Sequence, residues 1–181
     1  MKSSYEILLE KLRHFILKYY KNQIIKGLIL GLALIISFFL LITGIEFFAW
    51  SNSNTRLLLY YSFLGLSLFV FIYYIFIPFL RMFHLGKTLS ETEAARLIGH
   101  YFPEVSDKLL NTIQLHADQN SDQLDLLTAS INQKASELVP VPFKKAIDFK
   151  GNKKYLKYIL PPVLLLLILV GFSPDTITNP T

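Results

Sequence analysis

The sequence predicts an all-α integral membrane protein with three transmembrane helices, an amino-terminal amphipathic helix and a small helical cytoplasmic domain between the second and third spans. First, the apolar stretches 27–49, 57–80 and 155–172 are each long enough for a helix to cross a bilayer, which takes roughly 20 mostly apolar residues. Second, 52% of the 181 residues are hydrophobic and the mean hydropathy is +0.43, which is too apolar for a soluble domain of this size. Third, lysine and arginine are concentrated in only some of the connecting segments.

The distribution of lysine and arginine predicts the orientation. Residues 1–26 carry six of them, the link 50–56 carries one, the segment 81–154 carries ten, and residues 173–181 carry none. Positively charged flanks stay in the cytoplasm during insertion. We therefore expect a membrane protein whose amino terminus and segment 81–154 lie inside, in the cytoplasm, and whose link 50–56 and carboxyl terminus lie outside.

Residues 1–26 have the pattern of an amphipathic helix that precedes the first span. Apolar residues recur at intervals of three and four, which places them on one helical face. These residues are Tyr5, Leu8, Leu9, Leu12, Phe15, Ile16 and Tyr19. Two interpretations stay open: a helix that lies on the inner leaflet or docks onto a partner, and a helix that packs on the protein's own cytoplasmic segment.

The segment 81–154 is the part of the chain with the character of a soluble domain. Ser90 and Glu93 form a capping box, which predicts a helix near 91–101 that stops before Pro103. Ser106 or Asp107 can cap a second helix. Three short helices make a thin core, so we expect this domain to lean on the amino-terminal helix or on a partner.

A third helix in this domain is predicted to start at Ser121 and to carry one apolar face. Spacings of three and four place its apolar residues together. They are Leu124, Leu127, Ile131, Ala135 and Leu138, and four of them, Leu124, Leu127, Ile131 and Leu138, are the candidate docking face for a partner. The alternation of valine and proline over 139–142 then enforces extended backbone.

The sequence carries no recognisable catalytic, cofactor or metal motif. There are no cysteines, and the four histidines form no metal-ligand spacing. We find no phosphate-binding glycine loop, no dinucleotide fingerprint and no nucleophile elbow. We therefore expect no enzyme activity, no cofactor and no bound metal. The net charge of +5 could suggest nucleic acid, but the basic residues flank the spans, so we expect anionic lipid headgroups as partners instead.

Glu46 is the one ionisable residue well inside the first two spans, which makes it a candidate intramembrane carboxylate. Nineteen helical steps after residue 27 place it roughly 28 Å along a hydrocarbon core about 30 Å thick. A carboxylate near the outer boundary can reach water. Two interpretations stay open: a titrating group of a transporter or channel, and an interfacial carboxylate.

Small residues in the first span are candidates for close helix packing. Gly27 and Gly31 form a G-x-x-x-G pair, and Ala33 and Ser37 form a second small-residue pair. The contact could be within the chain or between chains. The alternative is that these residues face lipid.

Several short motifs together resemble one protein family. They are Ser4–Leu8, Tyr19–Gln23, Glu93–Gly99, Phe102–Val105, Asp107–Thr112 and Tyr155–Tyr158 with Pro161–Pro162. This set is similar to the amino-terminal membrane region of a family of large, uncharacterised Bacteroidota envelope proteins that is catalogued as a domain of unknown function. The resemblance implies an inner-membrane location, three early spans and a long periplasmic continuation, so we expect 173–181 to start a longer region. It supplies no catalytic residues.

These observations predict a non-catalytic inner-membrane anchor and interaction module. We expect a structural or accessory subunit of a larger cell-envelope complex, of the kind that serves secretion, motility or energy coupling. Its expected partners are membrane lipids and other membrane or envelope proteins, with a second copy of this chain among the candidates. The alternative from another class is a transporter or ion-channel component that uses Glu46 as its titrating group.

Overall fold

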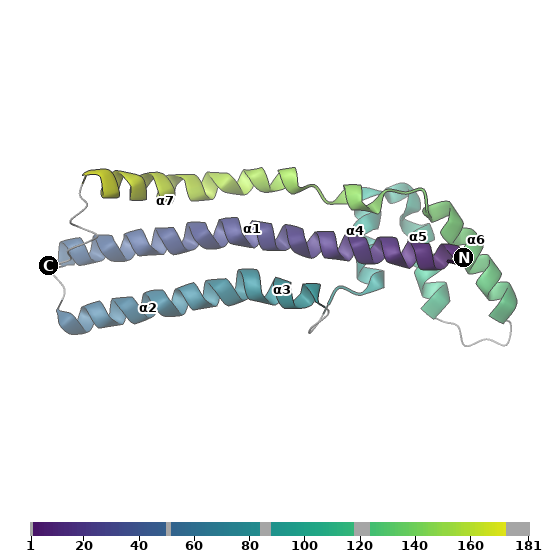
Figure 1. Ribbon diagram of the computed structural model, residues 1–181, viewed down its shortest axis with the longest axis horizontal. Helices are drawn as coiled ribbons and strands as arrows, with labels where there is room; N and C mark the ends of the chain where they lie inside the picture. The colour runs from purple at the N-terminus through teal and green to yellow at the C-terminus, as the bar shows by residue number, and fades with distance from the viewer. Residues whose placement is uncertain (1, 50–51, 84–87, 118–123, 173–181) are drawn as a thin grey trace. The chain divides into compact units, whose positions relative to one another are not determined.

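The computed structural model describes residues 2–49, 52–83, 88–117 and 124–172, and in these ranges the chain is helical, without strands. It divides into two compact units (Figure 1). The first unit comprises Met1–Lys21 and Arg81–Asp148, and the second comprises Asn22–Leu80 and Phe149–Thr181. Helix α1, Ser4–Ala49, contributes to both.

The amphipathic helix and the first predicted span form this one helix, α1, rather than two elements. Ser3 caps it, because its Oγ accepts from the Glu6 amide at 3.2 Å while its own amide donates to the Glu6 carboxylate at 3.0 Å. No proline occurs between Ser4 and Ala49, so nothing in the backbone forces the helix to stop where its composition changes.

The second span begins as α2, Ser53–Phe71, passes through a π-helical turn, η1, Ile72–Phe76, and ends as α3, Ile77–Met82. The cause of the turn lies in Pro78, which has no amide hydrogen to donate to the Tyr74 carbonyl. The amide of Ile77 reaches back five residues to the Ile72 carbonyl, which lengthens the turn ahead of the proline. The second span therefore accommodates Pro78 through a π bulge.

The third span is α7, Lys153–Phe172, which follows the short 3₁₀ helix η3, Phe149–Asn152. Pro161 and Pro162 lie inside α7. Three helical segments of the described chain are long and apolar enough to cross a membrane. They are Ser4–Phe47, Ser53–Met82 and Phe143–Gly171. In the most apolar 18 residues of each segment, 11%, 11% and 0% of the residues, respectively, are buried inside the structure.

In the first unit, α4, Glu91–Tyr101, α5, Pro103–Ala117, and α6, Leu124–Leu138, gather beside the amino-terminal part of α1 (Figure 1). The predicted capping box of α4 is confirmed: the Ser90 Oγ accepts from the Glu93 amide at 3.1 Å, and the Glu93 carboxylate accepts from the Ser90 amide at 2.9 Å. The 3₁₀ helix η2, Phe143–Ala146, follows α6.

The predicted start of the second short helix was wrong. Helix α5 begins at Pro103 rather than after Ser106 or Asp107. Proline suits the first helical position, because its missing amide hydrogen would be unpaired there and its φ is already helical. The predicted start of the third helix, Ser121, lies outside the described residues.

The core of the first unit is shared between α1 and the helices from 88–148. From α1, Leu8, Leu12 and Phe15 are each exposed by 1% or less. They belong to one buried cluster that includes Ile98 on α4, Leu109 on α5, Ile131 and Leu138 on α6, and Phe143. The amphipathic helix therefore packs on the protein's own segment, and the alternative of a helix lying on the leaflet or docking on a partner was wrong.

Candidate functional site

The docking face predicted on α6 is part of this core. Ile131 is 2% exposed, Leu138 is 0% exposed, and Leu127 packs against the same cluster. The side chain of Leu124 lies outside the described residues. Ile131 and Leu138 belong to the core that α6 shares with α1, α4 and α5. A docking role of α6 toward a partner stays a prediction.

Two lysines on the polar side of α1 bind carbonyl oxygens in the segment that follows α6. The Lys11 Nζ donates to the carbonyls of Val139 and, at 3.3 Å, Val141. The Lys18 Nζ donates to the Lys144 carbonyl at 2.6 Å. Carbonyls at and beyond a helix end lack intrahelical donors, and a lysine can supply them. These two lysines therefore join α1 to the segment after α6 within the first unit.

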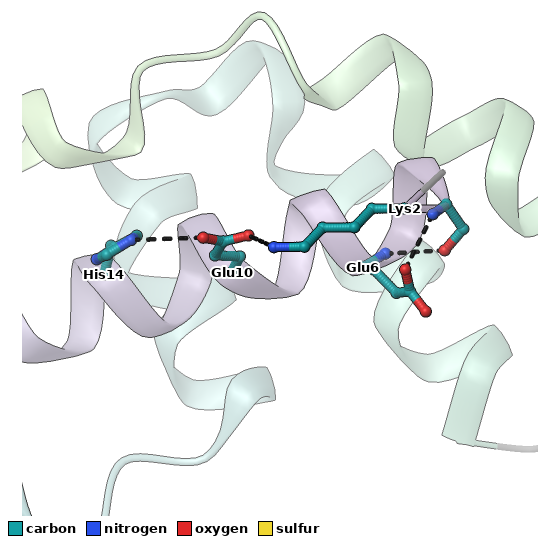
Figure 2. A network of polar contacts seen from close by, with 5 residues as sticks. Lys2, Glu6, Glu10 and His14 are labelled. Carbon is teal, nitrogen blue, oxygen red and sulfur yellow. Dashed lines mark hydrogen bonds and ion pairs between the residues drawn. The ribbon is translucent and has the colours of Figure 1, made fainter.

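The outer face of α1 carries an exposed polar network (Figure 2). The Lys2 Nζ lies 2.8 Å from the Glu10 carboxylate, and the His14 Nε2 lies 3.9 Å from the same group. The hydrogen bond from Lys2 lowers the pKa of Glu10, and the same bond raises the pKa of Lys2. Both groups are exposed, so water and salt screen the pair and it contributes little to stability.

Tyr5 is buried on the opposite side of α1 in a stack with a histidine. Its ring lies 4.1 Å from the His116 ring at an interplanar angle of 15°. Burial raises the pKa of Tyr5 to about 12, so the phenol is neutral at physiological pH. The pair joins α1 to α5 and serves packing.

Gly27 and Gly31 contact the second span within the second unit. A Cβ built on Gly27 would collide with the Tyr74 carbonyl oxygen and would lie 3.2 Å from the Tyr74 Cβ. A Cβ on Gly31 would lie 3.2 Å from the Val70 Cγ1. Tyr74 is the residue whose carbonyl loses its α-helical donor to Pro78. The glycines therefore pack within the chain, against the π bulge and the turn before it.

The second small-residue pair does not act as a unit. Ala33 is buried, whereas Ser37 is exposed. The contact between α1 and α2 continues instead through aromatic rings: Phe38 and Phe63 stack with centroids 6.4 Å apart, and Phe39 meets Phe63 edge-on at 6.1 Å.

Glu46 is paired with a cation. The Arg56 Nε lies 3.0 Å from the Glu46 Oε1, and the side chains are 39% and 26% exposed, respectively. Glu46 lies near the carboxyl end of α1 and Arg56 lies near the amino end of α2, so each is at the unfavourable end of its own helix dipole. Pairing across the two helices offsets both penalties.

A cationic cluster lies where α1 and α7 enter their apolar stretches. The Lys26 Nζ lies 4.8 Å from the centre of the Tyr155 ring, and the Lys154 Nζ lies 5.2 Å from the same ring. Beside them, the Asn152 amide donates to the Asn22 side-chain oxygen at 2.7 Å. We name Lys26, Lys154 and Tyr155 the interface cluster.

A search of the described residues finds no group of three or more histidine, cysteine, aspartate or glutamate side chains that could hold a metal. One shallow hollow of about 280 Å³ is lined by Phe102, Glu104, Val105, Pro140, Val141 and Pro142. Glu104 is its one charged side chain, so no acid–base pair or nucleophile converges there.

Sequence reasoning missed two of these features, although each had a signal. A proline four residues after Tyr74 marks the carbonyl that loses its donor, and the π bulge follows from it. Lys26 and Lys154 each directly precede a predicted span, but their approach to one ring needed the tertiary contact.

Comparisons with protein-family models, curated proteins and solved structures find no match to this chain.

Proposed function

We propose that this chain is an inner-membrane anchor and interaction module, and that it serves as a structural or accessory subunit of a larger cell-envelope complex. The observation that carries the proposal is the pairing of three exposed, apolar helices with a helical unit built around the start of the first of them. The spans fix the chain in the bilayer, and the helical unit is held at the membrane by α1. We also propose that the chain belongs to the Bacteroidota envelope family that its sequence motifs resemble, and this resemblance favours the same location.

The proposed orientation places the first unit in the cytoplasm and the link between α1 and α2 in the periplasm. Its support is the distribution of lysine and arginine, with ten in 81–154 and one in 50–56. A cytoplasmic amino terminus and three crossings require a periplasmic carboxyl terminus. This agreement between charge and crossing number is the main argument for the assignment.

Single cysteines test the orientation, because the natural chain has none. In intact spheroplasts, a membrane-impermeant maleimide is expected to label Ser53→Cys, while Arg96→Cys is labelled only after lysis. Both positions are exposed in the structure. Leu167→Cys, in the apolar part of α7, is the control and stays unlabelled in both preparations. Labelling of Arg96→Cys from outside, or of both positions from one side, contradicts the orientation.

The proposed role predicts a stable assembly. Cross-linking in native membranes, followed by mild extraction and native mass spectrometry, is expected to give a species of defined stoichiometry heavier than the 20.9 kDa chain. The added mass belongs to envelope proteins or to further copies of the chain. A monomer free of partners under these conditions contradicts a role as a subunit.

The alternative of a transporter or channel component has less support. That role needs Glu46 as a titrating group within the membrane, but Arg56 lies 3.0 Å from its carboxylate and both side chains are partly exposed. A paired, partly exposed carboxylate near a helix end fits an interfacial residue better than a proton relay at the midplane.

A further inference from the structure

The interface cluster brings two positive charges to one aromatic ring. The ammonium groups of Lys26 and Lys154 lie 4.8 Å and 5.2 Å from the centre of the Tyr155 ring. Each contact is a cation–π interaction. Two like charges at one ring repel each other, so the arrangement gains most when an anion lies between them.

Neither lysine of the cluster has a carboxylate partner among the described ion pairs. The described ion pairs join Lys2, His14, Arg56 and Lys108 to carboxylates, and they include neither Lys26 nor Lys154. In 22–80 and 149–172 the sole acidic residue is Glu46, which belongs to the pair with Arg56 near the other end of α1. The same ranges carry five lysines, namely Lys26, Lys150, Lys153, Lys154 and Lys157.

The sequence places the two lysines of the cluster at one depth. Lys26 directly precedes the apolar stretch 27–49, and Lys154 directly precedes 155–172. Both stretches start on the side that the charge distribution assigns to the cytoplasm. Headgroup phosphates lie at this boundary, where lysine and tyrosine are the residues that anchor helices.

Two local features favour the binding of an anion at the cluster. The hydrogen bond from Asn152 to Asn22, at 2.7 Å, joins the end of η3, directly before α7, to α1 and so holds the two lysines together. Lys154 lies in the first turn of α7, where the unpaired amides and the helix dipole favour negative charge. Beyond the cluster, Leu156 and Leu160 of α7 are 44% and 54% exposed, so acyl chains have an apolar surface to contact.

We propose that Lys26, Lys154 and the hydroxyl of Tyr155 form a binding site for the phosphate of an anionic phospholipid in the inner leaflet. The two ammonium groups share the phosphate charge, and the phenol donates a hydrogen bond to a phosphate oxygen. The site rests on the membrane location of the proposed function. A lipid is preferred over free phosphate because the exposed apolar surface of α7 continues directly from the cluster.

The test compares lipids of different charge on the complete chain. Purified, delipidated protein in detergent is titrated with phosphatidylglycerol or phosphatidylcholine and followed by native mass spectrometry. One phosphatidylglycerol is expected to bind at least about ten-fold more tightly than phosphatidylcholine. Lys26→Gln and Lys154→Gln are each expected to weaken phosphatidylglycerol about five-fold, since a lysine near an anionic surface contributes about that factor. Equal binding of the two lipids overturns the site.

Matched variants separate the cluster from general surface charge. Lys157→Gln removes the same charge from the same helix, but Lys157 lies 5.0 Å from a different ring, that of Tyr158. It is expected to change phosphatidylglycerol binding by less than about two-fold, whereas a loss equal to that of Lys26→Gln overturns the site. Lys26→Arg and Lys154→Arg keep the charge and are expected to keep the binding.

Two further measurements test whether the bound phosphate belongs to a lipid, and whether a negative result concerns the site or the membrane location. Inorganic phosphate in large excess is expected to leave bound phosphatidylglycerol in place, and complete displacement overturns the lipid assignment. Recovery of the wild-type chain in membranes after an alkaline carbonate wash tests the membrane location separately. A chain that stays in the membrane but does not distinguish the lipids overturns the site alone.

Discussion

Replacing Phe15 with alanine is expected to lower the free energy of unfolding of the first unit by about 3–5 kcal/mol, the usual cost of removing a buried aromatic side chain. Phe15 is 1% exposed and belongs to the cluster that joins α1 to α4, α5 and α6. The helices of 88–148 are short and share their core with α1. The cavity left by the ring would therefore weaken the contact that holds this unit together.

Pulse proteolysis of the complete chain in a urea series measures this effect, because lysines for trypsin are spread through 81–148. Arg13→Ala is the matched control, since Arg13 lies on the same helix two residues earlier and is exposed. It is expected to change the free energy of unfolding by no more than about 0.5 kcal/mol. Equal stability of the two variants would show that α1 does not supply the core.

Replacing Gly27 with alanine is expected to weaken the pairing of α1 with the second span. Alanine favours the helix itself by about 1 kcal/mol, but its Cβ would collide with the Tyr74 carbonyl oxygen. That oxygen belongs to the backbone of the π bulge, so it cannot rotate away as a flexible side chain would. Overpacking of this kind costs about 1–3 kcal/mol, which exceeds the gain in helix propensity over most of its range.

Gly44→Ala is the control, because a Cβ at Gly44 meets no atom within 4 Å and so causes no collision. It adds the same methyl group to the same helix and is expected to keep or strengthen the pairing. Cysteines at Phe38 and Phe63, whose rings stack at 6.4 Å, report the pairing by their rate of disulfide formation. The rate is expected to fall with Gly27→Ala and to stay unchanged with Gly44→Ala. A common response of both variants would mean that Gly27 faces lipid.

Features that depend on neighbouring residues were predictable from the sequence. Ser90 and Glu93 are three residues apart, and their side chains reach each other's amides in any helix that starts there, so α4 has the predicted range. The apolar stretches predicted the three helices in the same way, because length and composition alone decide whether a helix can cross a bilayer. The start of α5 at Pro103 is also a local feature, because proline suits the first position of a helix.

The identity of the partner that covers each apolar or charged group was not predictable. The stripe through Ile131 and Leu138 has the same spacing whether it meets another protein or the chain's own first helix, since periodicity fixes which face is apolar but not what it contacts. Glu46 and Arg56 are ten positions apart, and only the antiparallel arrangement of α1 and α2 brings them to 3.0 Å.

Composition and spacing alone thus determined that this chain is helical, that three helices suit a bilayer and where α4 begins, because each of these depends on a single continuous stretch of the sequence. The tertiary structure decided that α1 completes the core of the first unit, that Gly27 receives the Tyr74 carbonyl and that Lys26 and Lys154 converge on Tyr155. Each of these contacts joins residues 47 or more positions apart, apart from the neighbours Lys154 and Tyr155. Contacts between such distant residues depend on how the helices pack, which no local pattern encodes.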